Sequence, residues 1–313
     1  MTSTPALSIS IPAYRQMSLA RSCIESILAQ TWTDFALTVY DDGASDDYAQ
    51  YLRSLGDPRV GYVRNPIRLG ALGNMFACLR QGTGRYTMAF HEDDLMSPQY
   101  LASAIDLLES RPDLGFVCAE VHDIADLPGE GAPAVTPEPE IIDSPAAFVR
   151  AILGGVNPMF GSVIYRRAAL ADAVPDHAAY ATLADRPFLM TIVERWSAAV
   201  IRAPLVGYRA HGPGDRDPRH DAMTVDHIVR LFTTYRSRLP EQMNDEDRRL
   251  FYSFTGYWLF VLYDLVPATQ RPTLAAYLRR VRREGLYEPG WRGRWGLRLQ
   301  LRAALGARSS GQS

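Results

Sequence analysis

Two acidic stretches decide the fold: Val39-Tyr-Asp-Asp-Gly-Ala-Ser-Asp-Asp47 and Phe90-His-Glu-Asp-Asp94. Each follows a short apolar run, at residues 35–40 and 86–90, of the kind that forms a buried strand. Acidic clusters at the carboxyl ends of two such strands point into one crevice, where open α/β sheets bind ligands. Packed carboxylates repel unless a cation or hydrogen-bond donors neutralise them, and magnesium-type ions bind carboxylate together with phosphate oxygens. The residues therefore favour a metal-dependent enzyme that acts on a nucleotide diphosphate.

Strand-like and helix-like patterns alternate outward from these two stretches over the first 120 residues. The strand-like runs cover 7–11, 35–40, 60–63, 86–90 and 114–119. The helical patterns cover 18–28, 46–55, 70–79 and 97–109. This alternation predicts an α/β fold with a mainly parallel, Rossmann-like sheet flanked by helices on both faces.

The rest of the chain is less regular. Residues 122–140 are rich in Pro, Gly and Glu and predict an exposed loop. Helical patterns at 143–153 and 187–196 alternate with strand-like runs at 161–165 and 198–202, and the pattern beyond Met223 is helical. We therefore predict one α/β domain over residues 1–212, with halves at about 1–120 and 121–212. A loop and a helical appendage follow over residues 213–313.

The composition is that of an ordinary folded protein, with 313 residues of which 47% are hydrophobic and 22% charged. Cys23, Cys78 and Cys118 lie far apart and without metal-ligand spacing, so we interpret them as core thiols in a reducing compartment. No basic region followed by an apolar stretch opens the sequence, and no uncharged apolar run approaches the roughly 18 residues that span a bilayer. These features predict a cytoplasmic location, with the inner face of the membrane as an alternative.

The carboxyl-terminal residues 271–313 carry ten arginines against Glu284 and Glu288, in a chain without lysine. Leucines, Trp291 and Trp295 are interleaved with these arginines. Basic amphipathic helices of this kind lie at anionic membrane surfaces, so the segment predicts peripheral membrane contact. A helical appendage that packs on the main domain, with its arginines in water or paired with the acidic residues of that domain, explains the pattern as well. No motif supports nucleic-acid binding.

Four motifs follow one another over residues 7–120: Ile11-Pro-Ala-Tyr14, Gln30-Thr-Trp-Thr-Asp-Phe35, Tyr40-Asp-Asp-Gly-Ala-Ser45 and His91-Glu-Asp-Asp94. In the order and spacing of these motifs, residues 7–120 resemble the family 2 glycosyltransferases of GT-A fold. The match is looser to residue 212. The resemblance implies inverting transfer of a sugar from a UDP- or dTDP-linked donor to a hydroxyl group. The expected acceptor is a saccharide or a lipid-linked saccharide, in cell-surface polysaccharide or glycoconjugate synthesis, with residues 1–120 binding the donor and 121–212 the acceptor.

The resemblance assigns the donor nucleotide to residues after the first strands: Pro12, Ala13, Tyr14, Asp41, Asp42, Arg68, Asn74 and Asp93. Tyr14 would stack on the base, and Asp42 would accept the N3–H of uracil or thymine. For Asp41 and Asp42, the alternative is a turn and a helix cap without a ligand. Arg68 would contact the base or a phosphate, or lie in solvent, and helix packing explains Asn74 equally well.

The same resemblance implies a divalent cation, manganese or magnesium, bound by Asp93 and Asp94 together with the donor diphosphate. His91 stands where the family more often has an aspartate, and Glu92 follows it, so these two residues are further candidates for the site. Imidazole also suits manganese. His211, in the segment Tyr208-Arg-Ala-His211, would be a further metal ligand, and the Arg209 guanidinium would bind phosphate oxygens.

The acceptor side requires a base, and the resemblance places it at Asp185, in Ala184-Asp-Arg-Pro-Phe-Leu189. A carboxylate there would deprotonate the acceptor hydroxyl as it attacks. Its neighbour Arg186 would keep Asp185 ionised or bind the acceptor. An aspartate at this place is also an ordinary helix cap.

Two other functions remain open from the residues. A donor-binding protein without turnover would explain His91 as a mark of lost metal binding. A sugar nucleotidyltransferase is less well supported, because the Gly- and Arg-rich loop with a lysine that it requires is absent. The sequence also lacks the dinucleotide-binding glycine motif, the phosphate-binding loop and the hydrolase nucleophile motif.

Overall fold

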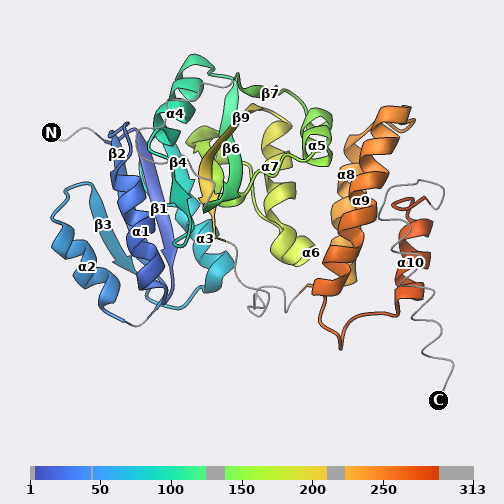
Figure 1. Ribbon diagram of the computed structural model, residues 1–313, viewed down its shortest axis with the longest axis horizontal. Helices are drawn as coiled ribbons and strands as arrows, with labels where there is room; N and C mark the ends of the chain where they lie inside the picture. The colour runs from blue at the N-terminus through green and yellow to red at the C-terminus, as the bar shows by residue number, and fades with distance from the viewer. Residues whose placement is uncertain (1–3, 44, 125–137, 210–222, 289–313) are drawn as a thin grey trace. The chain divides into compact units, whose positions relative to one another are not determined.

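The structure, a computed structural model, describes residues 4–43, 45–124, 138–209 and 223–288. The strands in these ranges are β1 (Leu7–Ala13), β2 (Phe35–Asp41), β3 (Val60–Arg64), β4 (Tyr86–Ala89), β5 (Leu95–Met96), β6 (Leu114–Asp123), β7 (Glu140–Ile142), β8 (Val163–Arg166) and β9 (Ser197–Tyr208). All of them belong to one sheet with the order β3-β2-β1-β4-β8-β6-β9-β5, and β7 pairs with β9 (Figure 1).

The first part of the sheet is parallel, as the alternation of patterns predicts. In register, Leu7 of β1 lies beside Phe35 of β2 and Tyr86 of β4, and β2 pairs in parallel with β3. The carboxyl ends of β1 and β2 therefore finish side by side, with Ala13 next to Asp41. Because parallel strands end at the same edge, the residues that follow β1, β2 and β4 gather there.

Helices connect these strands. The α-helices of the described residues are α1 (Met17–Leu28), α2 (Asp47–Leu55), α3 (Gly70–Arg80), α4 (Tyr100–Ser110), α5 (Pro145–Leu153), α6 (His177–Tyr180), α7 (Asp185–Val193), α8 (Val225–Arg238), α9 (Asp245–Leu265) and α10 (Leu274–Arg283). The predicted α/β class, with a helical carboxyl-terminal region, is confirmed.

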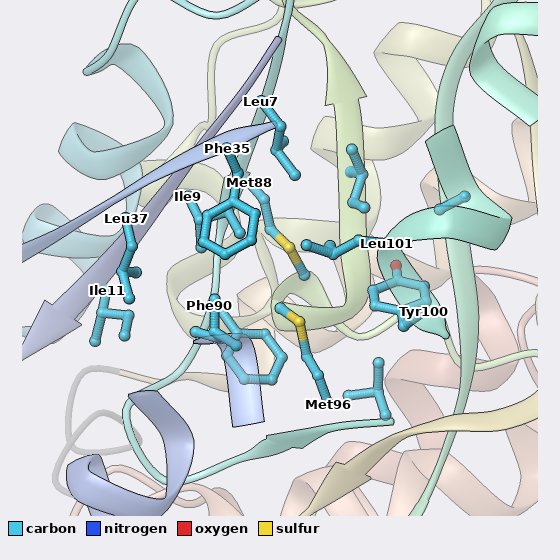
Figure 2. Close-up of a cluster of buried hydrophobic side chains, with 14 of the residues drawn as sticks. Leu7, Ile9, Ile11, Phe35, Leu37, Met88, Phe90, Met96, Tyr100 and Leu101 are labelled. Atoms are coloured by element: carbon cyan, nitrogen blue, oxygen red, sulfur yellow. The ribbon is translucent and has the colours of Figure 1, made fainter. Parts of the chain in front are cut away.

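Alternate residues of β1 point to opposite faces of the sheet. Leu7, Ile9 and Ile11 belong to one large apolar cluster (Figure 2). Ser8 points to the other side, where its Oγ accepts the N–H of Gly84 at 3.0 Å, just beyond α3. The buried residues of α1 belong to the same cluster as Leu7, Ile9 and Ile11; they are Ala20, Cys23, Ile24 and Ile27. Cys23, Cys78 and Cys118 are free and buried, as expected of core thiols.

The second part of the sheet mixes directions. Strand β8 is antiparallel to β4 and β6, whereas β6 and β9 are parallel with three irregularities in register. Strands β5 and β7, two and three residues long, have no counterpart in the predicted pattern, and both pair antiparallel with β9. The pairing of Leu95 with Gly207 brings the end of β9 to the segment that follows β4.

Contacts between Cα atoms divide the chain into two compact units. The first contains residues 1–144, 157–174 and 189–215, and the second contains 145–156, 175–188 and 216–313. The second unit therefore includes α5 and α6 as well as α8, α9 and α10, whereas the boundary predicted from the sequence lies at residue 212. Within the described ranges, none of the helices combines the length and the apolar character that crossing a bilayer requires.

The helical unit buries the apolar side of α10. Tyr277 and Val281 are buried; the Tyr277 ring stacks on Tyr263 of α9 and its hydroxyl donates to the Leu259 carbonyl at 2.9 Å. Arg150 of α5 donates from Nε to buried Asp247 of α9 at 2.7 Å. The apolar side of α10 is therefore buried within the helical unit.

Candidate active site

Three side chains after β4 form a compact group of potential metal ligands. One ligand atom each from His91, Asp93 and Asp94 lies within 4.8 Å of the other two. His91 and Asp93 are half-buried, whereas Asp94 is fully buried. Imidazole nitrogen and carboxylate oxygen are both ligands of manganese, so this donor set fits a borderline divalent cation.

Asp94 is held by protein groups on both of its oxygens. Its Oδ2 lies 2.9 Å from His91 Nδ1, and its Oδ1 accepts the backbone N–H of Arg209 at 3.1 Å. The Arg209 Nε also donates to the Asp93 carbonyl at 3.1 Å. A carboxylate bonded to one imidazole nitrogen orients the ring and leaves the other nitrogen for a metal, an arrangement common around metal-binding histidines. Asp94 therefore fixes both His91 and Arg209 at this edge of the sheet.

Two residues that the motifs did not indicate lie against His91, Cys23 at its main chain and Gly161 at its imidazole ring. The Cys23 thiol donates to the His91 carbonyl at 3.2 Å. Burial raises the pKa of Cys23 well above its ordinary value, and the charges of Asp94 and Glu92 raise it further, so the thiol stays protonated as a donor. A Cβ atom at Gly161 would lie 3.0 Å from His91 Nδ1, so this glycine leaves room for the imidazole.

The carboxylates that end β2 are also paired with protein donors. Asp41 accepts the Gly43 N–H at 2.8 Å and the Tyr62 hydroxyl at 2.9 Å. Asp42 accepts the N–H groups of Leu69 and Gly70, each at 2.8 Å, at the start of α3. Both carboxylates are buried. Without them, the N–H and O–H groups that they accept from would lose a hydrogen-bond partner, which is costly inside a protein.

Asn74 joins the same network from inside α3. Its Nδ2 donates to the Tyr40 carbonyl at 2.9 Å, and its Oδ1 accepts from Asn65 at 3.0 Å. The Asn65 amide also donates to Asp42 at 3.0 Å. Asn74 is 3% exposed, and its hydrogen bonds connect α3 to the end of β2.

The loop after β1 presents Tyr14, which is half-buried. The Arg68 guanidinium carbon lies 4.4 Å from the centroid of the Tyr14 ring, which is cation–π distance. Pro12 and Ala13 are the last residues of β1, directly beside Tyr40 and Asp41 of β2. The predicted base-binding residues therefore come together at the edge that also holds the carboxylates.

Glu92 is not part of the group of potential metal ligands and is bonded to the loop after β1 and to α2. Its Oε1 accepts the Tyr14 N–H at 2.9 Å, and its Oε2 accepts the hydroxyl of Tyr48, a residue of α2 that sequence reasoning missed. Burial raises the pKa of Glu92 to about 7, although these two hydrogen bonds work in the opposite direction. Nothing in the spacing of Tyr48 signals this contact, because it depends on how α2 packs.

Three predicted site residues remain, and two of them belong to the second compact unit. Asp185 begins α7 and belongs, with Arg186, to the helical unit, where its Oδ1 accepts the Arg186 N–H at 2.8 Å. His211 lies outside the residues that the structure describes.

Comparison with known proteins decides the family. The model of glycosyl transferase family 2 matches residues 8–171, more than half of the chain. The chain belongs to this family. The matched range contains both acidic stretches and the loop after β1, so the resemblance read from the four motifs is confirmed.

Relatives match the family 2 chain over about a third of its length. A putative colanic acid biosynthesis glycosyl transferase of Escherichia coli K12 is 29% identical over 33% of this chain and 37% of its own length. The chondroitin synthase of Escherichia coli is 32% identical over 36% of this chain and 16% of its own length. An Escherichia coli β-1,3-glucosyltransferase named for UDP-glucose and a GlcNAc-diphosphoundecaprenol is 27% identical over 34% of this chain and 42% of its own. The chain thus spans less than half of each relative.

Solved structures share the fold over most of the chain. S. aureus TarS 1–349 in complex with UDP-GlcNAc has a TM-score of 0.55 and 15% identity, over 90% of this chain and 89% of that chain. A Pyrobaculum calidifontis mannosyltransferase in complex with GDP-mannose and Mn²⁺ has a TM-score of 0.54 and 17% identity, over 98% and 81%. At these identities the likeness shows the fold, which is that of the GT-A glycosyltransferases.

Proposed function

We propose that the chain is an inverting glycosyltransferase that moves a sugar from a UDP- or dTDP-linked donor to a hydroxyl group. The observation that carries this proposal is the group formed by His91, Asp93 and Asp94 at the carboxyl edge of the sheet, next to the loop after β1. Family membership supports sugar transfer, and the relatives named for colanic acid and chondroitin support a role in cell-surface polysaccharide synthesis. The acceptor is then a saccharide or a lipid-linked saccharide.

Donor binding is divided between two sets of residues in this proposal. Pro12, Ala13 and Tyr14 contact the base, and Arg68 contacts the base or a phosphate. Asp41, Asp42 and Asn74 support donor binding from behind these residues, because their hydrogen bonds hold the end of β2 and the start of α3 in place. The Arg209 guanidinium, bonded to the Asp93 carbonyl, is near enough to the acidic segment to clamp a diphosphate oxygen.

His91, Asp93 and Asp94, with His211, would hold manganese or magnesium. When bound, the cation neutralises the charge that grows on the departing nucleoside diphosphate. Asp185 accepts the proton of the acceptor hydroxyl while the hydroxyl oxygen attacks the anomeric carbon. The bond from this carbon to the diphosphate oxygen breaks, and its electron pair leaves with the nucleoside diphosphate. Arg186 keeps Asp185 ionised or binds the acceptor.

Calorimetric titration with UDP, dTDP, GDP and CDP, each with and without manganese, tests this proposal. We expect manganese-dependent binding of UDP or dTDP and not of GDP or CDP. Absence of binding by all four nucleotides would refute the proposal. Binding without turnover, measured as release of nucleoside diphosphate from a panel of UDP- and dTDP-sugars with lipid-linked acceptors, would favour a donor-binding protein.

The Asp185→Asn variant tests the base. Transfer should fall by about 10²–10⁴-fold, the usual contribution of a general base, while the donor binds as in the wild type. An equal loss of donor binding would show that Asp185 has another role.

Peripheral membrane contact through residues 271–313 is a further part of the proposal. Within α10, Arg279 is exposed, as are Arg282 and Arg283 next to it, whereas the apolar side is buried in the helical unit. Contact would therefore be electrostatic and not by insertion of this helix. We expect the full chain to sediment with vesicles that contain anionic lipid and not with neutral ones. Replacement of all three arginines by glutamine should weaken this binding; unchanged sedimentation would refute the contact through α10.

A further inference from the structure

Glu92 and Tyr48 form a buried pair that holds the loop after β1. We infer that this pair is a positioning device, which fixes residues 14–16 for donor binding and couples them to the metal-binding segment. The inference rests on the proposed function, since it concerns how the same site receives its nucleotide. It assigns Glu92 a role different from metal binding.

The hydrogen bonds run from the acidic segment to two neighbouring backbone groups. Glu92 accepts the Tyr14 N–H with one oxygen and the Tyr48 hydroxyl with the other. The Tyr48 oxygen in turn accepts the Gln16 N–H at 3.1 Å. Glu92 is 8% exposed and Tyr48 is 2% exposed, so loss of either partner leaves a buried polar group unpaired. Both Glu92 oxygens are therefore committed to the loop and not to the neighbouring ligand group.

The residue between the two held amides is strained. Arg15 has a φ of 61°, in the left-handed region that residues other than glycine rarely adopt. Such a conformation persists only where its surroundings determine it. Here the N–H groups on each side, those of Tyr14 and Gln16, are the two that Glu92 and Tyr48 hold. The pair thus supplies the constraint that this turn requires.

The turn sets the direction of Tyr14, whose ring lies 4.4 Å from the carbon of the Arg68 guanidinium. Glu92 itself lies between His91 and Asp93 in the sequence. One short segment therefore carries potential metal ligands on one side and the support of the base-binding loop on the other. A shift of this segment on metal binding would be passed directly to the loop.

Hydrogen exchange of the ligand-free protein tests the pair without any nucleotide. In Tyr48→Phe and Glu92→Ala, the amides of residues 14 and 16 should exchange at least about tenfold faster, because a lost hydrogen bond lowers the local opening free energy. Glu92→Gln, which keeps an acceptor for the Tyr14 N–H, should protect residue 14 largely as in the wild type. Tyr51→Phe is the matched control, since the Tyr51 hydroxyl of the same helix bonds to Glu25 instead. Unchanged exchange at residues 14 and 16 in Tyr48→Phe would overturn the inference.

Binding of UMP and dTMP without metal tests the consequence for the donor. We expect Tyr48→Phe to bind the preferred nucleotide about tenfold more weakly than the wild type, and Tyr51→Phe to bind it equally well. Arg15→Gly removes the strain, so its combination with Tyr48→Phe should lose less affinity than the two single changes predict together. Unaltered affinity in Tyr48→Phe would overturn this inference and leave the proposed function in place. A wild type that binds neither nucleotide, nor UDP or dTDP with manganese, would instead overturn the proposed function and with it the role of the pair in donor binding.

Discussion

The two acidic clusters at the edge of the sheet are alike in sequence and unlike in structure. In the β2 cluster, Asp41 and Asp42, each carboxylate accepts at least two hydrogen bonds from neighbouring backbone groups and side chains. The β4 cluster, residues 91–94, is divided. Glu92 is buried and bonded to the loop after β1 and to α2, whereas half-buried His91 and Asp93 form, with buried Asp94, the group of potential metal ligands.

This difference separates anchoring carboxylates from those suited to bind a ligand. A buried carboxylate with its oxygens satisfied organises the backbone around it, and its removal costs mainly stability. A half-buried group beside like charges is the one that a cation can reach. The comparison therefore predicts which changes affect the reaction and which affect the fold.

The largest effect is expected for Asp93→Ala. Transfer should fall by about 10³-fold or more, because a metal contributes several kcal/mol to charge stabilisation and each 1.36 kcal/mol is a factor of ten. Calorimetry with manganese and UDP should show the loss directly, while the unfolding midpoint changes little. Transfer within tenfold of the wild type would place Asp93 among the anchors.

Asp42→Asn should act mainly on stability. The free energy of unfolding is expected to fall by about 2 kcal/mol, because the amide offers one acceptor where the carboxylate holds Leu69, Gly70 and Asn65. Urea denaturation measures this change. Asp46→Asn, at an exposed ion pair with Arg64, is the control and should change stability by less than about 0.5 kcal/mol. Equal effects of the two changes would remove the distinction between anchor and surface charge.

His91→Asn separates the two candidate cations. Manganese affinity should fall about 10–100-fold, and magnesium affinity should fall less, because magnesium has little preference for imidazole. Titration of both metals in the presence of the preferred nucleoside diphosphate measures this. Equal losses for the two metals would mean that His91 orients its neighbours and does not bind the ion itself.

The pKa of Glu92 predicts a pH dependence of the ligand-free, metal-free protein. Its pKa is about 7 in the folded chain against 4.5 ordinarily, so the folded state binds more protons between these values. Stability should therefore fall as pH rises from about 4.5 to 7, by about 1–3 kcal/mol from this group. Urea denaturation at several pH values should show this step as a difference between the wild type and Glu92→Gln. Parallel curves for the two proteins would contradict the prediction.

The smallest effect is expected for Tyr62→Phe, which removes one of the two donors to Asp41. The free energy of unfolding should fall by about 1 kcal/mol, the usual net value of one hydrogen bond. Thermal unfolding with and without UDP measures it. A loss of nucleotide affinity larger than the loss of stability would assign Asp41 directly to the ligand.

Most of the first half of the fold follows from its sequence pattern. The run predicted at 35–40 is β2, Phe35–Asp41, and the helix predicted at 70–79 is α3, Gly70–Arg80. The helix predicted from residue 97 begins instead at Tyr100, because the Ser97 N–H bonds to the Leu205 carbonyl beside β5. A strand as short as β5 forms because it pairs with a distant strand, and the local pattern of apolar residues does not reveal it.

The sequence by itself determined that both acidic stretches end strands of one parallel sheet, because strand and helix patterns are local. It thereby brought Tyr14, Asp42 and Asp93 to one edge. Only the tertiary structure decided which protein groups each carboxylate is bonded to. Their donors come from residues such as Tyr48, Tyr62 and Arg209, which are far away in the chain. A hydrogen bond acts over about 3 Å, so its partner is set by how elements pack and not by spacing along the sequence.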